Sequence, residues 1–156
     1  MATLKNTVPA PAVKATRPLA STALVLDDLG KLLLRVTLGG LLLLHGIAKI
    51  QGGIDPIIDA VAKAGLPTLL AYAVYVGEVL APLLLIVGLW TRAAALLIVV
   101  NMAAAVVLMH AGDLRALSPS GGWKLELQAF YLATALAIAL LGSGRFAITP
   151  DRRHRA

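Results

Sequence analysis

Four long apolar runs constrain this chain more than any other feature of its sequence. They cover residues 29–48, 68–90, 93–111 and 125–142. A helix needs about 20 residues to cross about 30 Å of hydrocarbon, and the four runs reach or approach that length. None alternates apolar and polar residues as the strands of a membrane barrel do. The pattern predicts an all-α, polytopic integral membrane protein, a bundle of four transmembrane helices.

The balance of apolar and charged residues supports this fold class. Of the 156 residues, 59% are hydrophobic and 14% are charged, whereas about a quarter of the residues of a soluble domain are charged. Lipid removes the need for a polar shell around so much apolar surface. The sequence has no cysteine, which excludes disulfides, thiolate nucleophiles and cysteine-bound clusters. A redox function therefore requires a bound cofactor or a partner protein.

The segments outside the runs predict three regions. Residues 1–28 contain prolines and basic side chains, and we expect a tail that is disordered or lies on the membrane surface. Residues 29–145 form the transmembrane domain, and residues 146–156 form a basic cytoplasmic tail. Between the first two runs, residues 54–64 place apolar and charged side chains on opposite sides, which predicts a short amphipathic helix at the interface.

Basic residues predict the orientation. Lysine and arginine concentrate in the two tails and in the turn between the second and third runs, and fewer lie in the other two connections. The positive-inside rule places the basic side in the cytoplasm. We therefore expect a multi-pass membrane protein with both termini cytoplasmic and the opposite face periplasmic or extracellular. The net charge of +6 is interpreted as an orientation signal, with the bilayer as partner and no nucleic acid.

The first run carries a stripe of polar residues. Arg35, His45 and Lys49 recur with Leu38 and Leu42 at spacings of three and four, which places all five on one helix face. They are candidates for a site inside the bundle. The alternative is that Arg35 extends toward the inner surface and that His45 and Lys49 only mark the outer interface.

Glu78 is the strongest single candidate for function. It lies near the middle of the second run, on the same face as Tyr75 and Pro82. A charge at that depth costs about 2.5–3.5 kcal/mol. Pro82 has no amide proton, so the carbonyl of Glu78 loses its α-helical partner. Such polarity favours an ion, proton or cofactor site, and the alternative is a structural ion pair with Arg35.

Two histidines are expected at the outer level of the bundle. His45 and His110 end the first and third runs and are suited to relaying protons. A haem or metal ion is not expected, because no third ligand is visible at a suitable spacing. Asn101, in the middle of the third run, is expected to form a hydrogen bond between helices.

The fourth run opens with Trp123 and Glu126. Trp123 is expected to anchor the chain at the interface. An acidic residue in the first turn of a helix is stabilised by the helix dipole, which accounts for Glu126 without any function. The alternative is that Glu126 faces the bundle with His45, Lys49 and His110 and forms a charged pocket with them.

Several motifs, in this order along the chain, resemble those of the DoxX family of small bacterial membrane proteins. The resemblance covers about residues 29–150. The motifs are an early Arg35, His45-Gly46-x-x-Lys49, Gly77-Glu78, Gly88-Leu89-Trp90-Thr91-Arg92, His110, Glu126 and Gly142-Ser143-Gly144-Arg145.

The resemblance implies a membrane subunit of a quinone-linked oxidoreductase system, with a quinone as the cofactor and a partner subunit or a homo-oligomer as the assembly. Glu78, His45 and His110 are then the candidate catalytic residues. The candidate binding residues are Arg35, Lys49, Tyr75, Glu126 and Trp123. Two other functions remain open: a non-catalytic scaffold for a partner protein, and a small proton-coupled transporter that requires oligomerisation.

Overall fold

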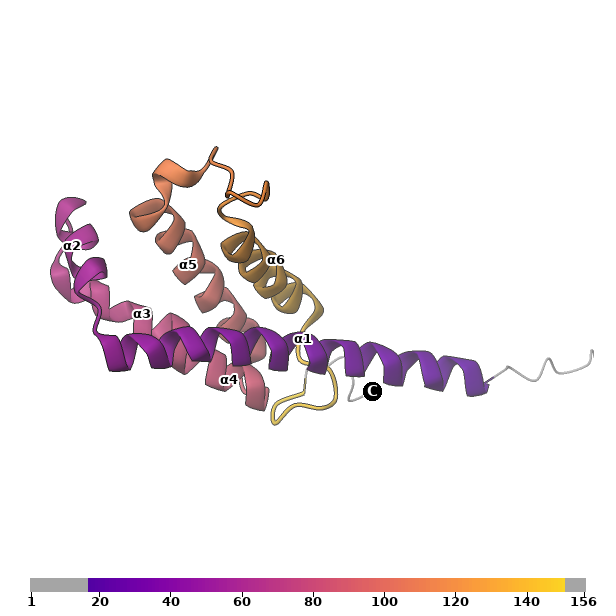
Figure 1. The fold of residues 1–156 in the computed structure, drawn as a ribbon. Helices are drawn as coiled ribbons and strands as arrows, with labels where there is room; N and C mark the ends of the chain where they lie inside the picture. Colours follow the sequence, from indigo (N-terminus) through magenta and orange to yellow (C-terminus); the bar gives the residue numbers. More distant parts are fainter. Residues whose placement is uncertain (1–16, 151–156) are drawn as a thin grey trace, which may run out of the picture.

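The structure, a computed structural model, describes residues 17–150 and is helical, with no strand in that range (Figure 1). This confirms the all-α prediction. The elements are α1 (Arg17–Gly52), α2 (Asp55–Lys63), η1 (Thr68–Tyr72), α3 (Ala73–Tyr75), η2 (Val76–Leu80), α4 (Ala81–Val87), α5 (Thr91–Met109), η3 (Ala111–Asp113) and α6 (Glu126–Leu141).

Three helical segments are long and apolar enough to cross a membrane. They are Thr22–Gly52, Thr68–Val87 and Thr91–Met109. The second of these runs without a break through η1, α3, η2 and α4. The fourth predicted span corresponds to α6, which is apolar but has only 16 residues. The number of spans thus remains a prediction, while the apolar helices agree with a membrane protein.

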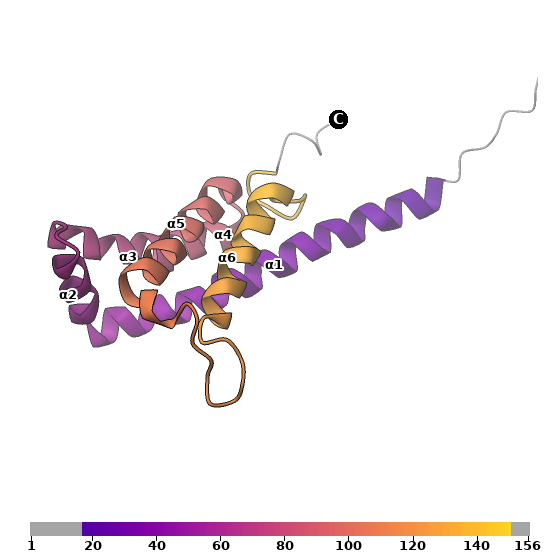
Figure 2. The ribbon, with the colours of Figure 1, turned by 90° about the horizontal axis from the view of Figure 1, so that it is seen from above.

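The first helix begins earlier than the sequence suggested. Residues 17–28 form the first turns of α1, so they are not disordered, while the alternative that this part lies on the membrane surface stays a prediction. Residues 1–16 lie outside the described residues. Proline is tolerated in the first turn of a helix, where Pro18 lies. Asp28 is 2% exposed and accepts a hydrogen bond from the backbone N–H of Arg145 at 3.1 Å. Figure 2 shows this part of α1 extending past the other helices.

The second span changes its helical type at Glu78. Pro82 has no N–H to donate to Glu78 O in an α-helical turn. The chain instead forms a π turn over η2, in which the N–H of Ala81 donates to Val76 O, five residues earlier. Such short π segments occur often at functional sites. The buried Glu78 therefore lies in a locally widened turn.

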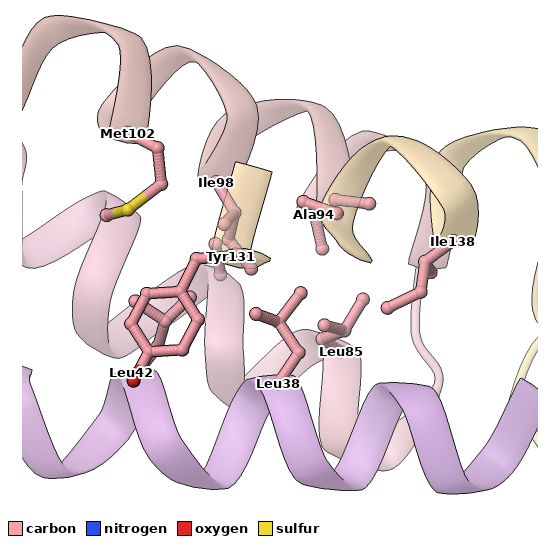
Figure 3. Packing of buried hydrophobic residues seen from close by; sticks show 11 residues of the cluster. Leu38, Leu42, Leu85, Ala94, Ile98, Met102, Tyr131 and Ile138 are labelled. Carbon is pink, nitrogen blue, oxygen red and sulfur yellow. The ribbon is translucent and has the colours of Figure 1, made fainter. Parts of the chain in front are cut away.

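The core forms where α1, α4, α5 and α6 meet (Figure 3). α1 packs against α4 and α6, and α5 packs against α4 and α6. Leucine and isoleucine supply most of the volume, and alanines allow close packing of the helix backbones. The buried residues labelled in Figure 3 are Leu38, Leu42, Leu85, Ala94, Ile98, Met102, Tyr131 and Ile138.

Two glycines bring α1 against the second span. A Cβ atom at Gly46 would collide with the backbone carbonyl of Glu78, and one at Gly39 would lie 2.7 Å from Ile86 Cγ1. Because these two residues have no side chain, the two helices approach closely. The close approach at Gly46 places the outer end of α1 directly against η2.

The predicted amphipathic helix is present as α2. Its apolar side packs on the protein, since Val61 is 2% exposed and clusters with Ile54, Ala71 and Val74. α2 therefore covers one end of the bundle, where it contacts η1 and α5. The charged residues Asp59 and Lys63 remain exposed.

Replacing Gly46 with alanine should destabilise the protein by about 1–3 kcal/mol, because the new methyl group meets backbone rather than a movable side chain. Gly40→Ala is the matched control, since a Cβ there meets nothing within 4 Å. It should leave stability unchanged or raise it by up to about 1 kcal/mol. Thermal unfolding in mild detergent measures both, and equal effects at the two positions would contradict the packing described here.

Candidate functional site

An ion pair between Lys49 and Glu78 forms the centre of the candidate site. Glu78 is 4% exposed and lies in η2, while Lys49 lies in the last turn of α1. The alternative pairing of Glu78 with Arg35 is wrong. Arg35 and Lys49 are fourteen residues apart on one helix, which is about 21 Å along its axis. The close approach at Gly46 sets Glu78 beside the lysine and far from the arginine.

A polar cavity of about 220 Å³ lies on one side of this pair. It is formed between α1, η2, α5 and the first turns of α6. The structure thus brings together His45, Lys49, Glu78 and His110, which the sequence analysis had selected from three separate runs. The polar residues that line this cavity are His45, Lys49, Glu78, His110, Gln128 and Tyr131.

His45 is bound to the fourth apolar run. Its Nε2 lies 3.2 Å from the hydroxyl of Tyr131, and the two rings pack edge to face with centroids 5.8 Å apart. Figure 3 shows the Tyr131 side chain reaching from α6 toward α1. Tyr131 is buried in the core, and the sequence analysis did not select it. Nothing in the local sequence distinguishes it from a core aromatic residue.

His110 connects the polar cavity with the loop of residues 111–125, which is the outer loop in the predicted topology. Its Nε2 lies 3.4 Å from the amide nitrogen of Gln128, which can only donate, so the imidazole accepts there. Its Nδ1 then carries the proton and lies 3.5 Å from Asp113 Oδ2. Asp113 also accepts a hydrogen bond from Lys124 at 2.9 Å. These groups lead from the loop surface to the cavity wall.

The two histidines do not form part of a metal-binding cluster. Within residues 22–150, whose side chains are described, no three histidine, aspartate or glutamate side chains gather closely enough to hold a metal ion. His45 and His110 line one cavity, but each is held by a different neighbour, Tyr131 and Gln128.

A second cavity, mostly apolar and about 230 Å³ in volume, lies on the other side of the ion pair. It shares Lys49, Glu78, Ala105 and His110 with the polar cavity, and its other walls come from α2, η1, α3 and α5. Asn101 also lines it, and its Nδ2 is buried without a hydrogen-bond partner. The hydrogen bond between helices that was expected of Asn101 is therefore not made by its amide nitrogen.

Arg35 lies apart from both cavities and has a structural environment. It is 1% exposed, so the expectation that it extends to the surface was wrong. Its guanidinium donates to Leu85 O at 3.1 Å, Ile86 O at 3.3 Å and Phe146 O at 3.0 Å, and also to Ser143 O. A cation at a helix C-terminus stabilises the free carbonyls there. Arg35 thus joins α1, the end of α4 and the segment after α6.

The remaining candidates lie around the site rather than inside the two cavities. Glu126 is exposed in the first turn of α6, close to Gly122, and lines neither cavity. The Nε1 of Trp123 donates to Leu114 O at 3.0 Å and holds the outer loop. The hydroxyl of Tyr75 donates to Lys49 O at 3.4 Å. These contacts place Glu126 and Trp123 in the loop region and Tyr75 against the end of α1.

Removing one member of the central ion pair should be costly. We expect Lys49→Met to destabilise the protein by about 3–5 kcal/mol, since the buried charge of Glu78 is left unpaired. Glu78→Gln should cost less, because the Lys49 side chain is 29% exposed and part of its charge is solvated. The double variant should regain most of that loss. Unfolding in detergent gives the coupling energy. The exposed pair of Asp113 and Lys124 is the control, with an expected coupling of at most about 1 kcal/mol. Strictly additive effects at Lys49 and Glu78 would contradict a buried pair.

The outer loop should loosen at low pH. The hydrogen bond from Lys124 lowers the pKa of Asp113 below its ordinary value of 3.8, and His110 adds to this. A depressed carboxyl pKa stabilises the folded state above the unfolded pKa, and this contribution is lost as the pH falls through the lowered value. Hydrogen exchange of the loop amides, followed as the pH is lowered from 5 through the lowered pKa of Asp113, should show this loss of stability. Asp113→Asn should remove the pH dependence, and an unchanged profile in that variant would contradict the assignment.

Comparison with known proteins identifies the family of this chain. The family model described as DoxX matches residues 30–111. The chain is 30% identical over 123 residues to the Putative oxidoreductase CatD of Bacillus subtilis (strain 168), and the match covers 79% of this chain and 87% of that protein. No solved structure matches the chain.

The match to the family model includes the residues of the central ion pair and both histidines of the polar cavity. Tyr131 and Gln128 lie beyond it, in α6. More than half of the chain is covered, and the relative extends the similarity over most of the remainder. The chain belongs to the DoxX family.

Proposed function

We propose that this protein is a membrane subunit of a quinone-linked oxidoreductase system, with its quinone or proton site at the Lys49–Glu78 ion pair. The observation that carries the proposal is a buried carboxylate and its lysine, placed between a polar and an apolar cavity. Polar groups that converge on an apolar pocket are typical of small-molecule sites. The name of the Bacillus subtilis relative, an oxidoreductase, supports the class of reaction.

The residues present fit a quinone. A quinone has a flat apolar ring with two carbonyl oxygens, so its site needs apolar walls and hydrogen-bond donors. The unpartnered Nδ2 of Asn101 offers one donor in the apolar cavity. Lys49 and the hydroxyl of Tyr131 offer others on the polar side. When bound, a quinone supplies two-electron redox chemistry coupled to protons.

The side chains of the polar cavity are suited to holding and moving protons. The carboxylate of Glu78 can hold a proton at either oxygen, and its contact with Lys49 fixes the position of the carboxylate at the cavity. Imidazole titrates near neutral pH. His110 lines the cavity together with Glu78 and contacts Asp113 of the loop, and we propose that it relays protons between Glu78 and the loop surface. His45 holds the hydroxyl of Tyr131 at the same cavity.

The proposed topology has four spans, with both termini on the cytoplasmic side of a bacterial inner membrane. Sixteen residues of α6 rise about 24 Å, so residues flanking α6 complete the fourth span. The contact between Asp28 and Arg145 brings the first and last helices together at one end of the bundle. This supports an even number of spans, and the basic residues of the tails support the cytoplasmic side.

Electrons must come from outside the chain, because no cysteine is available to bind a cluster. We therefore infer a partner subunit, or a homo-oligomer that meets a soluble redox protein. The bilayer is the other partner. Nothing in the site resembles a nucleic-acid surface, since the basic residues near it, Lys49 and Lys124, are paired with carboxylates.

Purification in mild detergent tests the proposal. We expect quinone in the solvent extract of the wild-type protein and a quinone signal in its redox difference spectrum. The double variant Lys49→Met, Glu78→Gln should retain at least tenfold less quinone than the wild-type protein. It stays folded, because both charges are removed together. Wild-type protein without quinone, or equal retention in the two proteins, would reject the redox site.

A non-catalytic scaffold is the second candidate, and one observation favours it. The ion pair of Lys49 and Glu78 joins α1 to η2, and Arg35 joins α1 to α4 and the segment after α6, as purely structural contacts would. On this alternative the folded double variant would still capture its partner and support full redox activity of the complex. Loss of that activity with the complex intact favours the redox site instead.

A further inference from the structure

The apolar cavity has an opening along the side of the bundle. Leu70 and Ala73 on one edge and Ala104 and Met109 on the other are exposed and also line the cavity. They belong to the second span and to α5. In a membrane these edges face lipid, so the cavity opens between two helices toward hydrocarbon.

Helix α2 covers part of the same cavity, next to Lys49 and His110, which also line the polar cavity. Ile57 and Val61 of α2 line it, and Val61 packs with Ala71 and Val74, all of them buried. α2 therefore lies between this cavity and the outer solution. A molecule dissolved in the bilayer has a more direct route into it than one dissolved in water.

One polar atom in this apolar cavity is unsatisfied. The Nδ2 of Asn101 is buried without a hydrogen-bond partner, and such a group costs about 1–3 kcal/mol. The side chain is held from behind, because Asn101 packs directly on Gly77 and any side chain at Gly77 would collide with it. A fixed donor in an apolar wall is suited to an acceptor oxygen on a ligand.

We propose that a bilayer-dissolved molecule with an apolar tail and a carbonyl oxygen enters sideways between η1 and α5, and that Asn101 Nδ2 binds its carbonyl. This deepens the proposed function and rests on it for the redox step, since the quinone is then a tailed, membrane-dissolved one. Its ring lies beside Glu78, which lines both cavities. Its tail leaves through the side opening into lipid. Asn101 is thereby a recognition residue.

Photolabelling in lipid nanodiscs tests the side entry with a probe that is redox-inert in the dark. The probe is an alkyl-tailed benzophenone, which has one carbonyl between two apolar rings. We expect saturable labelling of the segments around Leu70 and Ala104. Asn101→Leu keeps the size of the side chain. It should raise the probe concentration that gives half-maximal labelling about three- to tenfold, as the loss of one hydrogen bond predicts.

Ala104→Phe fills the cavity and should abolish saturable labelling. Ala103→Phe is the matched control, because Ala103 is exposed on the same helix and does not line the cavity, and it should label as wild type. Thermal unfolding confirms that each variant is folded. Uniform labelling of all lipid-facing segments without saturation, or equal labelling in the two phenylalanine variants, would overturn the proposal.

Competition separates this proposal from the redox function. A naphthoquinone with an isoprenoid tail should displace the probe, and the same ring without a tail should compete at least tenfold more weakly. If labelling is saturable but no quinone displaces the probe, the carbonyl-binding site stands and the proposal that its ligand is a quinone is rejected. Quinone retained by the purified protein without saturable labelling would reject the side entry and keep the redox function.

Discussion

The cost of charge inside an apolar bundle governs how these helices are arranged. Glu78 is buried at a depth where a lone carboxylate is expensive, and its ion pair with Lys49 fixes the outer end of α1 against the second span. Arg35 does the same near the middle of α1, where it donates to carbonyls of two other segments. α1 is thus fixed at two levels about four turns apart, and the core packs between them.

The position of Glu78 depends on two backbone features that act together. Pro82 cannot complete an α-helical turn, and the chain responds with the π turn of η2. Gly46 has no side chain, so α1 approaches that turn until backbone meets backbone. A proline on one helix and a glycine on another thus decide where a carboxylate and a lysine meet.

The polar groups of the bundle divide into two kinds. Lys49, Glu78 and Arg35 have partners in the chain, and these contacts stabilise the fold. The Nδ2 of Asn101 and the Oε1 of Gln128 are buried without partners, and each lines one of the two cavities beside the ion pair. Buried polar atoms are nearly always hydrogen-bonded. The two atoms beside the ion pair therefore mark a place where a ligand or water would complete the structure, whereas a third unpartnered atom, Thr91 Oγ1, lines neither cavity.

Local patterns predicted most of the helices and part of the site. The apolar runs predicted α5, α6 and the second span, because hydrophobic length is a property of adjacent residues. The early start of α1 was missed, since it involves a contact of Asp28 with Arg145, more than a hundred residues away. His45, Lys49, Glu78 and His110 were selected because charged and imidazole side chains are rare in apolar runs. Asn101 was noted, but not as part of a site.

The sequence by itself determined that the chain is helical and apolar. It also identified the polar side chains that lie within apolar helices, where burial without a partner is costly. Only the tertiary structure decided which of them meet. Glu78 pairs with Lys49 rather than Arg35, and Tyr131 and Gln128 complete the polar cavity from α6. The physical reason is that hydrophobicity and helix periodicity are local, whereas the rotation and axial position of one helix against another depend on close contacts such as the one at Gly46.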